Sequence, residues 1–351
     1  MTAPLHLSVL DLVPVRDGQT SAQAVAASMR LAALADRLGY TRYWFAEHHN
    51  MPAVASTTPP VLIAAAAART ERIRVGSGGV MLPNHSPLVV AEQFAALEAL
   101  APGRIDLGLG RAPGSDGVIT QLLRMSGTTS DVDRFGDHVA DIAALVQPDG
   151  ATLRLTSGRE YAVHATPGAS GAPAIWLLGS SDFSARLAAE LGLPYVFAYH
   201  FAGEGIERAL ELYRTGYRPS EAHPEPRTFL TLNASVAQTH EEARARALPQ
   251  LRGMARIQTG RPLQALETVD QAEAATPDAA TAQVVAAMER RWVIGAPGEA
   301  AAEVRRLAER YGVDEVMVSP VAGAYEHEGA DASPGRERTL ELLARDVLPS
   351  G

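Results

Sequence analysis

The chain has 351 residues, a formal net charge of −9 at pH 7 and no cysteine. It also contains no lysine, so every basic side chain is Arg or His. The negative charge argues against nucleic acid or an anionic membrane as a partner. The missing residue types exclude disulfides, thiolate catalysis, cysteine metal sites and enzymes that form a lysine Schiff base.

The sequence shows no targeting or membrane-spanning segment. Residues 1–12 lack a basic start, and Asp11 interrupts their apolar run, which argues against a secretory signal. The longest apolar run, residues 59–68, is too short to span a bilayer. We therefore expect a soluble protein of the cytoplasm.

Short runs rich in β-branched and aromatic residues alternate with runs of helical period along the chain. Thr20 and Gln23 have capping-box spacing at the first helix, and Gly39 follows its end. The predicted strands are residues 7–12, 42–47, 73–80, 105–110, 174–178, 195–198, 229–237 and 315–319. The predicted helices are residues 20–38, 59–68, 87–100, 133–146, 181–191, 204–217, a stretch from 241, 297–311 and 335–347.

This alternation predicts an α/β fold, a (β/α)8 TIM barrel with insertions. No segment has the composition of a linker, so we interpret residues 1–351 as one domain. A polar loop is expected at 112–131 and a small hairpin at 153–163. Residues 259–281 are polar, Ala-rich and weakly patterned, and they predict a mobile insertion around 255–292.

The end of the second predicted strand carries three titratable residues in a row. Glu47, His48 and His49 stand where a barrel places its active site, at the C-terminal end of a strand. An imidazole can move a proton at neutral pH, and a neighbouring acid such as Glu47 can orient or tune it. We therefore predict His48 and Glu47 as catalytic residues.

Two adjacent glycines interrupt the third predicted strand. Gly78 and Gly79 indicate either a bulge or the close approach of a flat ligand to the backbone. A second glycine pattern, Gly108-x-Gly110, resembles a dinucleotide-binding fingerprint only superficially, because Pro113 replaces the third glycine and a loop follows.

An anion site is predicted where two neighbouring strands end. Arg111 follows the fourth strand and can hold a phosphate or form a surface ion pair. Ser180 and Ser181 begin a helix and Ser184 lies one turn on, which suits either an N-cap or an anion site. Because barrel phosphate sites are commonly built from adjacent strand ends, the two features support each other.

A metal-dependent barrel hydrolase is the alternative from another chemical class. It would use Glu47, His48, His49 and His200. Successive strand residues point to opposite faces, so His48 and His49 would not ordinarily bind one ion. The His-x-His spacing of barrel metal sites is also absent, and we predict no metal site.

Four stretches carry a resemblance to a known family. They are residues 39–49 with Tyr-Trp-Phe-Ala-Glu-His-His at their end, residues 75–83, residues 103–111 and residues 188–194. On these motifs the chain resembles the luciferase-like flavin monooxygenases over essentially its whole length. It is especially similar to the single-subunit bacterial branch that shares the Glu-His-His signature of the luciferase α subunit.

The resemblance implies an FMN-dependent monooxygenase in which reduced flavin reacts with O2 and the peroxyflavin oxidises a small organic substrate. His48 corresponds to the active-site base, and Gly78-Gly79 to a non-prolyl cis peptide beneath the isoalloxazine ring. Arg111, Ser180, Ser181 and Ser184 fall at phosphate-binding positions. The deazaflavin F420 is the less favoured cofactor.

The resemblance also implies partners for the chain. A homodimer is expected, and a separate NAD(P)H:flavin reductase could supply reduced FMN. Gly110 stands where bacterial luciferase has a cysteine, and Pro113 lacks an N–H that would reach the phosphate, so luciferase activity itself is not expected. A flavin-binding barrel without catalytic activity is a third interpretation of the sequence.

Overall fold

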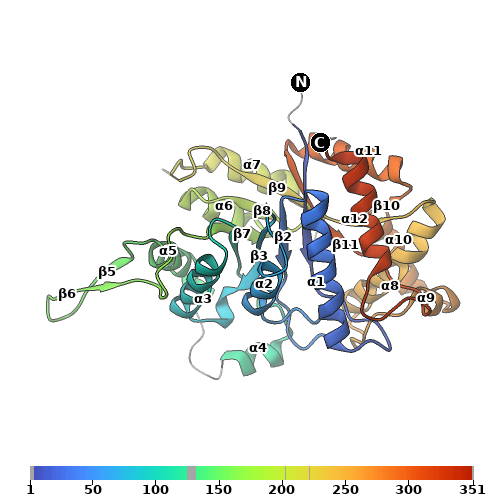
Figure 1. Cartoon of the computed structure of the whole chain (residues 1–351), viewed down its shortest axis with the longest axis horizontal. Helices are drawn as coiled ribbons and strands as arrows, with labels where there is room; N and C mark the ends of the chain where they lie inside the picture. The colour runs from blue at the N-terminus through green and yellow to red at the C-terminus, as the bar shows by residue number, and fades with distance from the viewer. Residues whose placement is uncertain (1–3, 125–131, 202, 221, 350–351) are drawn as a thin grey trace.

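Eight parallel strands pair edge to edge in a closed ring, and helices surround them (Figure 1). The computed structural model describes residues 4–124, 132–201, 203–220 and 222–349. The ring runs β1–β2–β3–β4–β7–β8–β9–β11 and closes where β11 pairs with β1. The strands are β1 His6–Asp11, β2 Arg42–Phe45, β3 Arg74–Met81, β4 Ile105–Gly110, β7 Ala174–Gly179, β8 Tyr195–Phe197, β9 Thr228–Val236 and β11 Glu315–Pro320. The predicted (β/α)8 barrel is confirmed.

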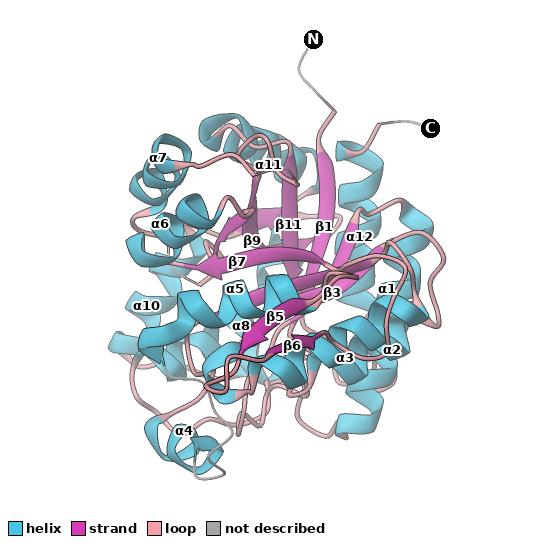
Figure 2. Ribbon diagram, turned by 90° about the vertical axis from the view of Figure 1, so that its left-hand side faces the viewer, coloured by secondary structure: helices cyan, strands magenta, loops and turns pink. Residues whose placement is uncertain are grey.

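The helices form a layer around the barrel (Figure 2). The capping box of Thr20 with Gln23 begins the first helix, and Gly39 ends it at φ +83°, as the sequence predicted. The apolar faces of the helices and the outer faces of the strands form the main core. The helices are α1 Ser21–Leu38, α2 Pro59–Ala67, α3 Pro87–Leu100, α5 Phe135–Leu145, α6 Asp182–Leu191, α7 Ile206–Gly216, α8 His240–Gln258, α11 Pro297–Tyr311 and α12 Pro334–Val347.

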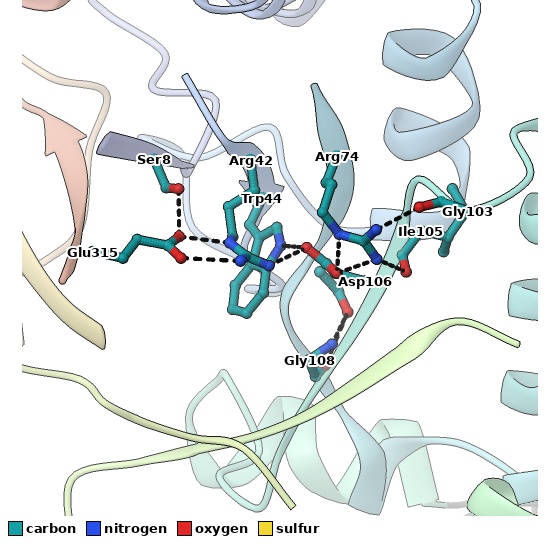
Figure 3. A network of polar contacts seen from close by, with 10 residues as sticks. Ser8, Arg42, Trp44, Arg74, Gly103, Ile105, Asp106, Gly108 and Glu315 are labelled. Atoms are coloured by element: carbon teal, nitrogen blue, oxygen red, sulfur yellow. Dashed lines mark hydrogen bonds and ion pairs between the residues drawn. The ribbon is translucent and has the colours of Figure 1, made fainter. Parts of the chain in front are cut away.

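Inside the ring, side chains fill the barrel in layers. The first layer, near the N-terminal ends of the strands, is a buried ion network in which Arg42 pairs with Asp106 at 2.8 Å and with Glu315 at 2.6 Å (Figure 3). Above it, a small aromatic cluster of Trp44, Trp176 and Phe229 packs with tilted and edge-to-face rings. These two layers close the barrel, and its C-terminal end remains for a ligand.

The second strand ends earlier than predicted. Strand β2 stops at Phe45, so Glu47 and His48 belong to the connection that follows it. This connection is tied down, because the His48 N–H donates to the Ser56 carbonyl at 3.0 Å and the Ser56 hydroxyl donates to the Ala46 carbonyl. The loop that carries the predicted catalytic residues is therefore held in place by hydrogen bonds.

Two local predictions around the insertions have different outcomes. The hairpin is confirmed as β5 Ala151–Arg154 and β6 Glu160–Val163, which project beyond the helical layer (Figure 1). The prediction of a continuous loop at 112–131 is wrong, because α4 Gly117–Arg124 forms within it, and 125–131 lie outside the described residues. The helix starts because the Asp116 carboxylate accepts hydrogen bonds from the N–H groups of Val118 and Ile119.

The weakly patterned insertion contains regular structure that the sequence did not predict. It contains α9 Val269–Ala274 and α10 Ala279–Glu289, and β10 Val293–Gly295 adds a ninth, unpredicted strand beside β9. Thr268 forms a capping box with Gln271, and Asp278 caps the second helix. Capping residues thus define these helices where apolar period does not.

Among the described residues, no helix combines the length and the apolar composition that crossing a bilayer requires.

Candidate functional site

A cavity of about 740 Å³ opens above the aromatic layer, at the C-terminal ends of the strands. Its volume lies in the range of pockets that hold cofactors and small substrates. His48 and all six residues predicted to bind a cofactor line it, whereas Glu47 does not: the six are Gly78, Gly79, Arg111, Ser180, Ser181 and Ser184. Residues predicted from separate strand ends therefore meet in one space.

The glycine pair forms a bare stretch of barrel wall. The peptide bond between Gly78 and Gly79 is cis, as the family resemblance implied. A Cβ atom at Gly78 would lie 2.6 Å from the Leu10 side chain, and one at Gly79 would lie 2.8 Å from the Gly108 carbonyl oxygen. A side chain at Gly79 would collide with the backbone and one at Gly78 would require Leu10 to move, and with glycine at both positions the cavity is bordered by bare backbone there.

Arg111 and the start of α6 lie at one corner of the cavity, and the residue types present there suit an anion, so this region is called the anion-binding corner below. The Arg111 guanidinium stacks on the Phe183 ring at 3.9 Å from its centroid, and it forms no ion pair with any carboxylate of the described residues. Ser181 is the N-cap residue of α6, but its side chain makes no capping hydrogen bond, so the hydroxyl and the first N–H groups remain for a ligand.

The anion-binding corner also contains the carboxylate of Asp182 and the hydroxyl of Ser184. The carboxylate of Asp182, in the first turn of α6, pairs with Arg208 at 2.7 Å, so its charge is compensated by a cation. The Ser184 hydroxyl donates to the Ser181 carbonyl at 2.9 Å and lies 3.5 Å from the Tyr195 hydroxyl. Ser184 thus supports the helix start while also lining the cavity.

Glu47 and His49 form a cluster beside the cavity and do not line it. Glu47 is fully buried, and its Oε1 atom contacts His49 Nε2 and His85 Nε2, each at 2.8 Å. Its Oε2 atom accepts a hydrogen bond from the Met81 N–H at 3.0 Å. Burial alone would raise the pKa of Glu47, but the hydrogen bonds from the two histidines outweigh it and lower the pKa to about 2. Glu47 is therefore a carboxylate at neutral pH.

The hydrogen bonds of Glu47 correct the expectation that it orients His48. Among the described residues, Glu47 makes no hydrogen bond to His48, and its Oε1 atom contacts His49 and His85 instead. Its remaining influence on His48 is the charge of the carboxylate, which raises the pKa of the imidazole. His85 was not predicted from the sequence, because it lies far along the chain from Glu47.

His48 faces the cavity without a protein partner for one of its nitrogens. Its Nδ1 atom is buried and makes no hydrogen bond within the described residues. Burial lowers the pKa of His48, and the Glu47 charge offsets this only in part. The ring is therefore neutral near pH 7, where it can accept a proton from a bound ligand.

His200 is a second histidine of the cavity wall, and the sequence singled it out only as a metal ligand. Its Nδ1 atom lies 2.9 Å from the Thr231 hydroxyl, and its carbonyl oxygen accepts a hydrogen bond from Asn233. Burial, together with the charge that His48 can carry, lowers the pKa of His200 to about 4.

The metal alternative needs four residues around one ion, and the structure separates them. His48 and His200 line the cavity, whereas Glu47 and His49 bond to each other beside it. Within the part of the chain that the structure describes, no three His, Asp or Glu side chains are grouped so as to hold a metal ion.

The sequence did not predict the apolar side of the cavity. The carboxyl half of α8 contributes Met254 and Ile257 to this wall, and the segment after the helix contributes Leu263 and Leu266. Phe201 and Trp292 add aromatic rings. The cavity therefore combines cations and histidines on some walls with apolar residues on another, at the C-terminal ends of the strands, where barrel enzymes place their active sites.

Comparison with known proteins identifies the family. The model of the family described as luciferase-like monooxygenase matches residues 5–315. The uncharacterized protein YvbT of Bacillus subtilis (strain 168) is 40% identical over 338 residues, which cover 96% of this chain and 95% of that protein. The N-acetyl-S-alkylcysteine monooxygenase of the same organism is 33% identical over 350 residues, 98% of each chain. The chain belongs to the luciferase-like monooxygenase family.

The chain is also similar to solved structures along almost its whole length. The crystal structure of apo-MsnO8 matches with a TM-score of 0.84 and 34% identity, over 99% of this chain and 100% of that one. The FMN complex of the oxygenating constituent of 3,6-diketocamphane monooxygenase from Pseudomonas putida has a TM-score of 0.70 and 18% identity, over 99% of each chain. An F420-dependent secondary alcohol dehydrogenase has a TM-score of 0.66 and 14% identity, over 97% of this chain and 99% of that one. These last two show a shared fold.

Proposed function

We propose that this protein is an FMN-dependent monooxygenase that uses reduced FMN and O2 to oxidise a small organic substrate. One observation carries the proposal: a single cavity contains a bare backbone wall, an anion-binding corner and a neutral histidine. A flavin mononucleotide has a flat ring and a phosphate, and its oxidation–reduction chemistry requires proton transfer. Each part of the cavity suits one of these properties.

The residues present fit the cofactor. Arg111, Ser180 and Ser181 would hold the phosphate at the start of α6, where free N–H groups and a cation favour an anion. The backbone of Gly78 and Gly79 would face the ring, because no side chain stands there. His48, with a buried Nδ1 atom that lacks a partner in the described protein, would handle a proton at the reacting end.

When bound, reduced FMN supplies two electrons, so that one oxygen atom of O2 enters the substrate and the other leaves as water. The chain itself positions, shields and exchanges protons. His48 is neutral near pH 7 and can take a proton from a bound group or return it. Glu47 supports this as a charged, buried neighbour that keeps His49 and His85 in place.

The apolar wall indicates the kind of substrate. Met254, Ile257, Leu263 and Leu266 cover the side of the cavity formed by α8 and the segment after it. Such a wall favours an organic molecule with an aliphatic or aromatic part. The relative from Bacillus subtilis that acts on N-acetyl-S-alkylcysteine, a molecule with an alkyl chain, is consistent with this class.

An F420-dependent oxidoreductase of the same fold is the second candidate. The observation in its favour is the structural likeness to a secondary alcohol dehydrogenase that uses F420. Both cofactors carry a flat ring and a phosphate, so the glycine wall and the anion-binding corner suit either one. Sequence likeness favours the monooxygenase, because the relative named for that activity is 33% identical along the chain.

An anaerobic titration tests the proposal. Reduced FMN and reduced F420 are added separately to the protein, and binding is followed by absorbance and fluorescence. Substrates with apolar chains are then added with ¹⁸O2, and the product is analysed by mass spectrometry. We expect tight binding of reduced FMN and one ¹⁸O atom in the product. Binding of F420 alone, or product without ¹⁸O, contradicts the monooxygenase.

The proposal includes a homodimer located in the cytoplasm and a separate reductase as partner. Helices α2 and α3 lie side by side and expose apolar residues to solvent: Val61, Leu88, Val89 and Leu100 are 65%, 41%, 47% and 71% exposed. A symmetric interface over this face would cover them. Light scattering at micromolar concentration tests the dimer, and a monomer there contradicts it. A separate NAD(P)H:flavin reductase would supply reduced FMN.

A further inference from the structure

His200 is held by two residues of the neighbouring strand. Strand β9 contributes Thr231, whose Oγ1 atom lies 2.9 Å from His200 Nδ1. It also contributes Asn233, whose Nδ2 atom donates to the His200 carbonyl at 2.8 Å. Both ring and backbone are therefore anchored, and His200 lines the cavity that His48 also lines.

The hydrogen bonds of Thr231 determine which nitrogen of His200 carries the proton. The Thr231 Oγ1 atom lies 2.9 Å from the Phe197 carbonyl oxygen, which can only accept. A hydroxyl has one proton, so the contact with Phe197 uses it. The contact with His200 then needs a proton on Nδ1, because otherwise two lone pairs would face each other at 2.9 Å.

Only this arrangement places a proton in both short contacts. The neutral ring of His200 therefore carries its hydrogen on Nδ1 and a lone pair on Nε2. The ring stays neutral over the physiological pH range, because burial and the nearby His48 lower its pKa to about 4. Nε2 is thus a fixed hydrogen-bond acceptor in the cavity wall, with Thr231 as its positioning residue.

We propose that this acceptor makes the cavity favour the reduced form of its flavin over the oxidised form. The inference rests on the proposed flavin cofactor. Reduction of the isoalloxazine ring adds an N–H at N5, where the oxidised ring has a lone pair. The Nε2 lone pair of His200 attracts an N–H and repels another lone pair. A monooxygenase that receives reduced flavin from solution benefits from this preference.

The first part of the test examines the tautomer in the ligand-free protein. Protein labelled with ¹⁵N-histidine is studied by long-range ¹H–¹⁵N NMR between pH 6 and pH 8, ring assignments being made with His200→Asn. We expect the pattern of a neutral ring protonated on Nδ1. Thr231→Ser, which keeps the hydroxyl, should preserve this pattern, and Thr231→Val should lose it. A ring protonated on Nε2 in the unmodified protein overturns the inference.

The second part measures the dissociation constants of oxidised and reduced FMN under anaerobic conditions. His200→Asn retains a donor that can reach Thr231 but has no atom in the place of Nε2. We expect the preference for reduced FMN to fall about 3- to 10-fold in this variant, on the scale of one hydrogen bond. Thr231→Ser is the matched control and should keep the preference of the unmodified protein.

The outcomes separate this inference from the proposed function. If neither form of FMN binds to the unmodified protein, the proposed function fails and the inference fails with it. If both forms bind and His200→Asn leaves their ratio unchanged, the inference alone is wrong. Circular dichroism confirms that His200→Asn is folded, and Thr231→Val provides a second variant in which the acceptor is disturbed without replacing His200.

Discussion

The barrel interior contains titratable side chains at two ends: a closed end near the N-terminal ends of the strands and an open end near their C-terminal ends. At the closed end, Arg42, Asp106 and Glu315 are buried and fully paired (Figure 3). Asp106 also accepts hydrogen bonds from Trp44 Nε1 and Arg74 Nε. At the open end, His48 has a buried nitrogen without a partner in the described protein.

This difference distinguishes buried polar groups that stabilise the fold from buried polar groups that are available to a ligand. A buried charge that is paired and hydrogen-bonded on all sides contributes to the fold, and removing one partner is costly. A buried polar atom without a partner destabilises the protein unless something else binds it. The pairing of a titratable group, and not its burial alone, therefore indicates which end of the barrel carries the chemistry.

Replacing His48 should give the largest effect at the open end. His48→Ala removes the proposed proton-handling group, and a positioned acid–base group contributes about 10²–10⁴-fold in rate. Turnover should fall by that range while FMN affinity stays nearly intact. Steady-state kinetics with the best substrate, together with FMN titration, measure both. His49→Ala is the neighbouring control and should cost less turnover, because His49 bonds to Glu47 beside the cavity. Full turnover in His48→Ala contradicts the assignment.

Replacing Arg42 should give the largest effect at the closed end. Arg42→Met leaves Asp106 and Glu315 buried with one cation fewer, and breaking such a pair costs about 3–5 kcal/mol. The free energy of unfolding from urea denaturation measures the loss. Arg338→Met is the matched control, because its pair with Glu341 is exposed and should contribute less than about 1 kcal/mol.

A compensating variant sharpens this result. Combining Arg42→Met with Glu315→Gln removes the carboxylate that loses its cation, because Asp106 keeps its pair with Arg74 at 2.7 Å, and it should recover part of the lost stability. If Arg42→Met alone changes stability no more than Arg338→Met does, the closed end is not a network that holds the barrel together.

The sequence predicted the fold well because its signals are local. Buried parallel strands appear as short apolar runs, and each barrel strand was found within a few residues of its observed bounds. Helices α4, α9 and α10 were missed because they are short or lack a clear apolar period, although Asp116, Thr268 and Asp278 cap them. Caps carried the information that the search for periodicity overlooked.

The sequence predicted which residues line the cavity, but it did not predict their hydrogen-bond partners. Strand ends gather at one end of a barrel, so His48, Arg111 and Ser180 were brought together correctly. Hydrogen-bond partners depend on the path of the loops, which local pattern does not specify. Glu47 therefore bonds to His85 from a distant segment, and the pairing of His200 with Thr231 across two strands was not predicted.

Arg111 tests the anion-binding corner of the open end. Arg111→Ala should weaken FMN binding by about 1.5–3 kcal/mol, the scale of a hydrogen bond to a charged group. Riboflavin lacks the phosphate and should bind almost unchanged, which makes it the matched control ligand. Isothermal titration calorimetry with both ligands measures the difference. An equal loss for both would show that Arg111 supports the fold through its contact with Phe183.

The smallest expected effect is the pH dependence of stability at the open end. The pKa of His200 is lowered from 6.5 to about 4 by burial and by His48. Between pH 6.5 and pH 4, His200 is protonated in the unfolded chain but stays neutral in the folded protein. The free energy of unfolding therefore falls as the pH drops from 6.5 to 4. Because the ring borders the cavity, where water reduces the cost of its charge, we expect a loss of about 1–2 kcal/mol.

Comparing variants assigns this loss to its source. The pKa values of His48 and His223 are also lowered by burial, so they act in the same direction and in the same pH range. Glu47, with its pKa lowered to about 2, adds a loss only as the pH falls below about 4.5. Urea denaturation of the unmodified protein and of His200→Gln at pH 7.5 and pH 5 isolates the contribution of His200. The drop between these two pH values should be smaller in His200→Gln, and an equal drop would mean that His200 titrates normally in the folded protein.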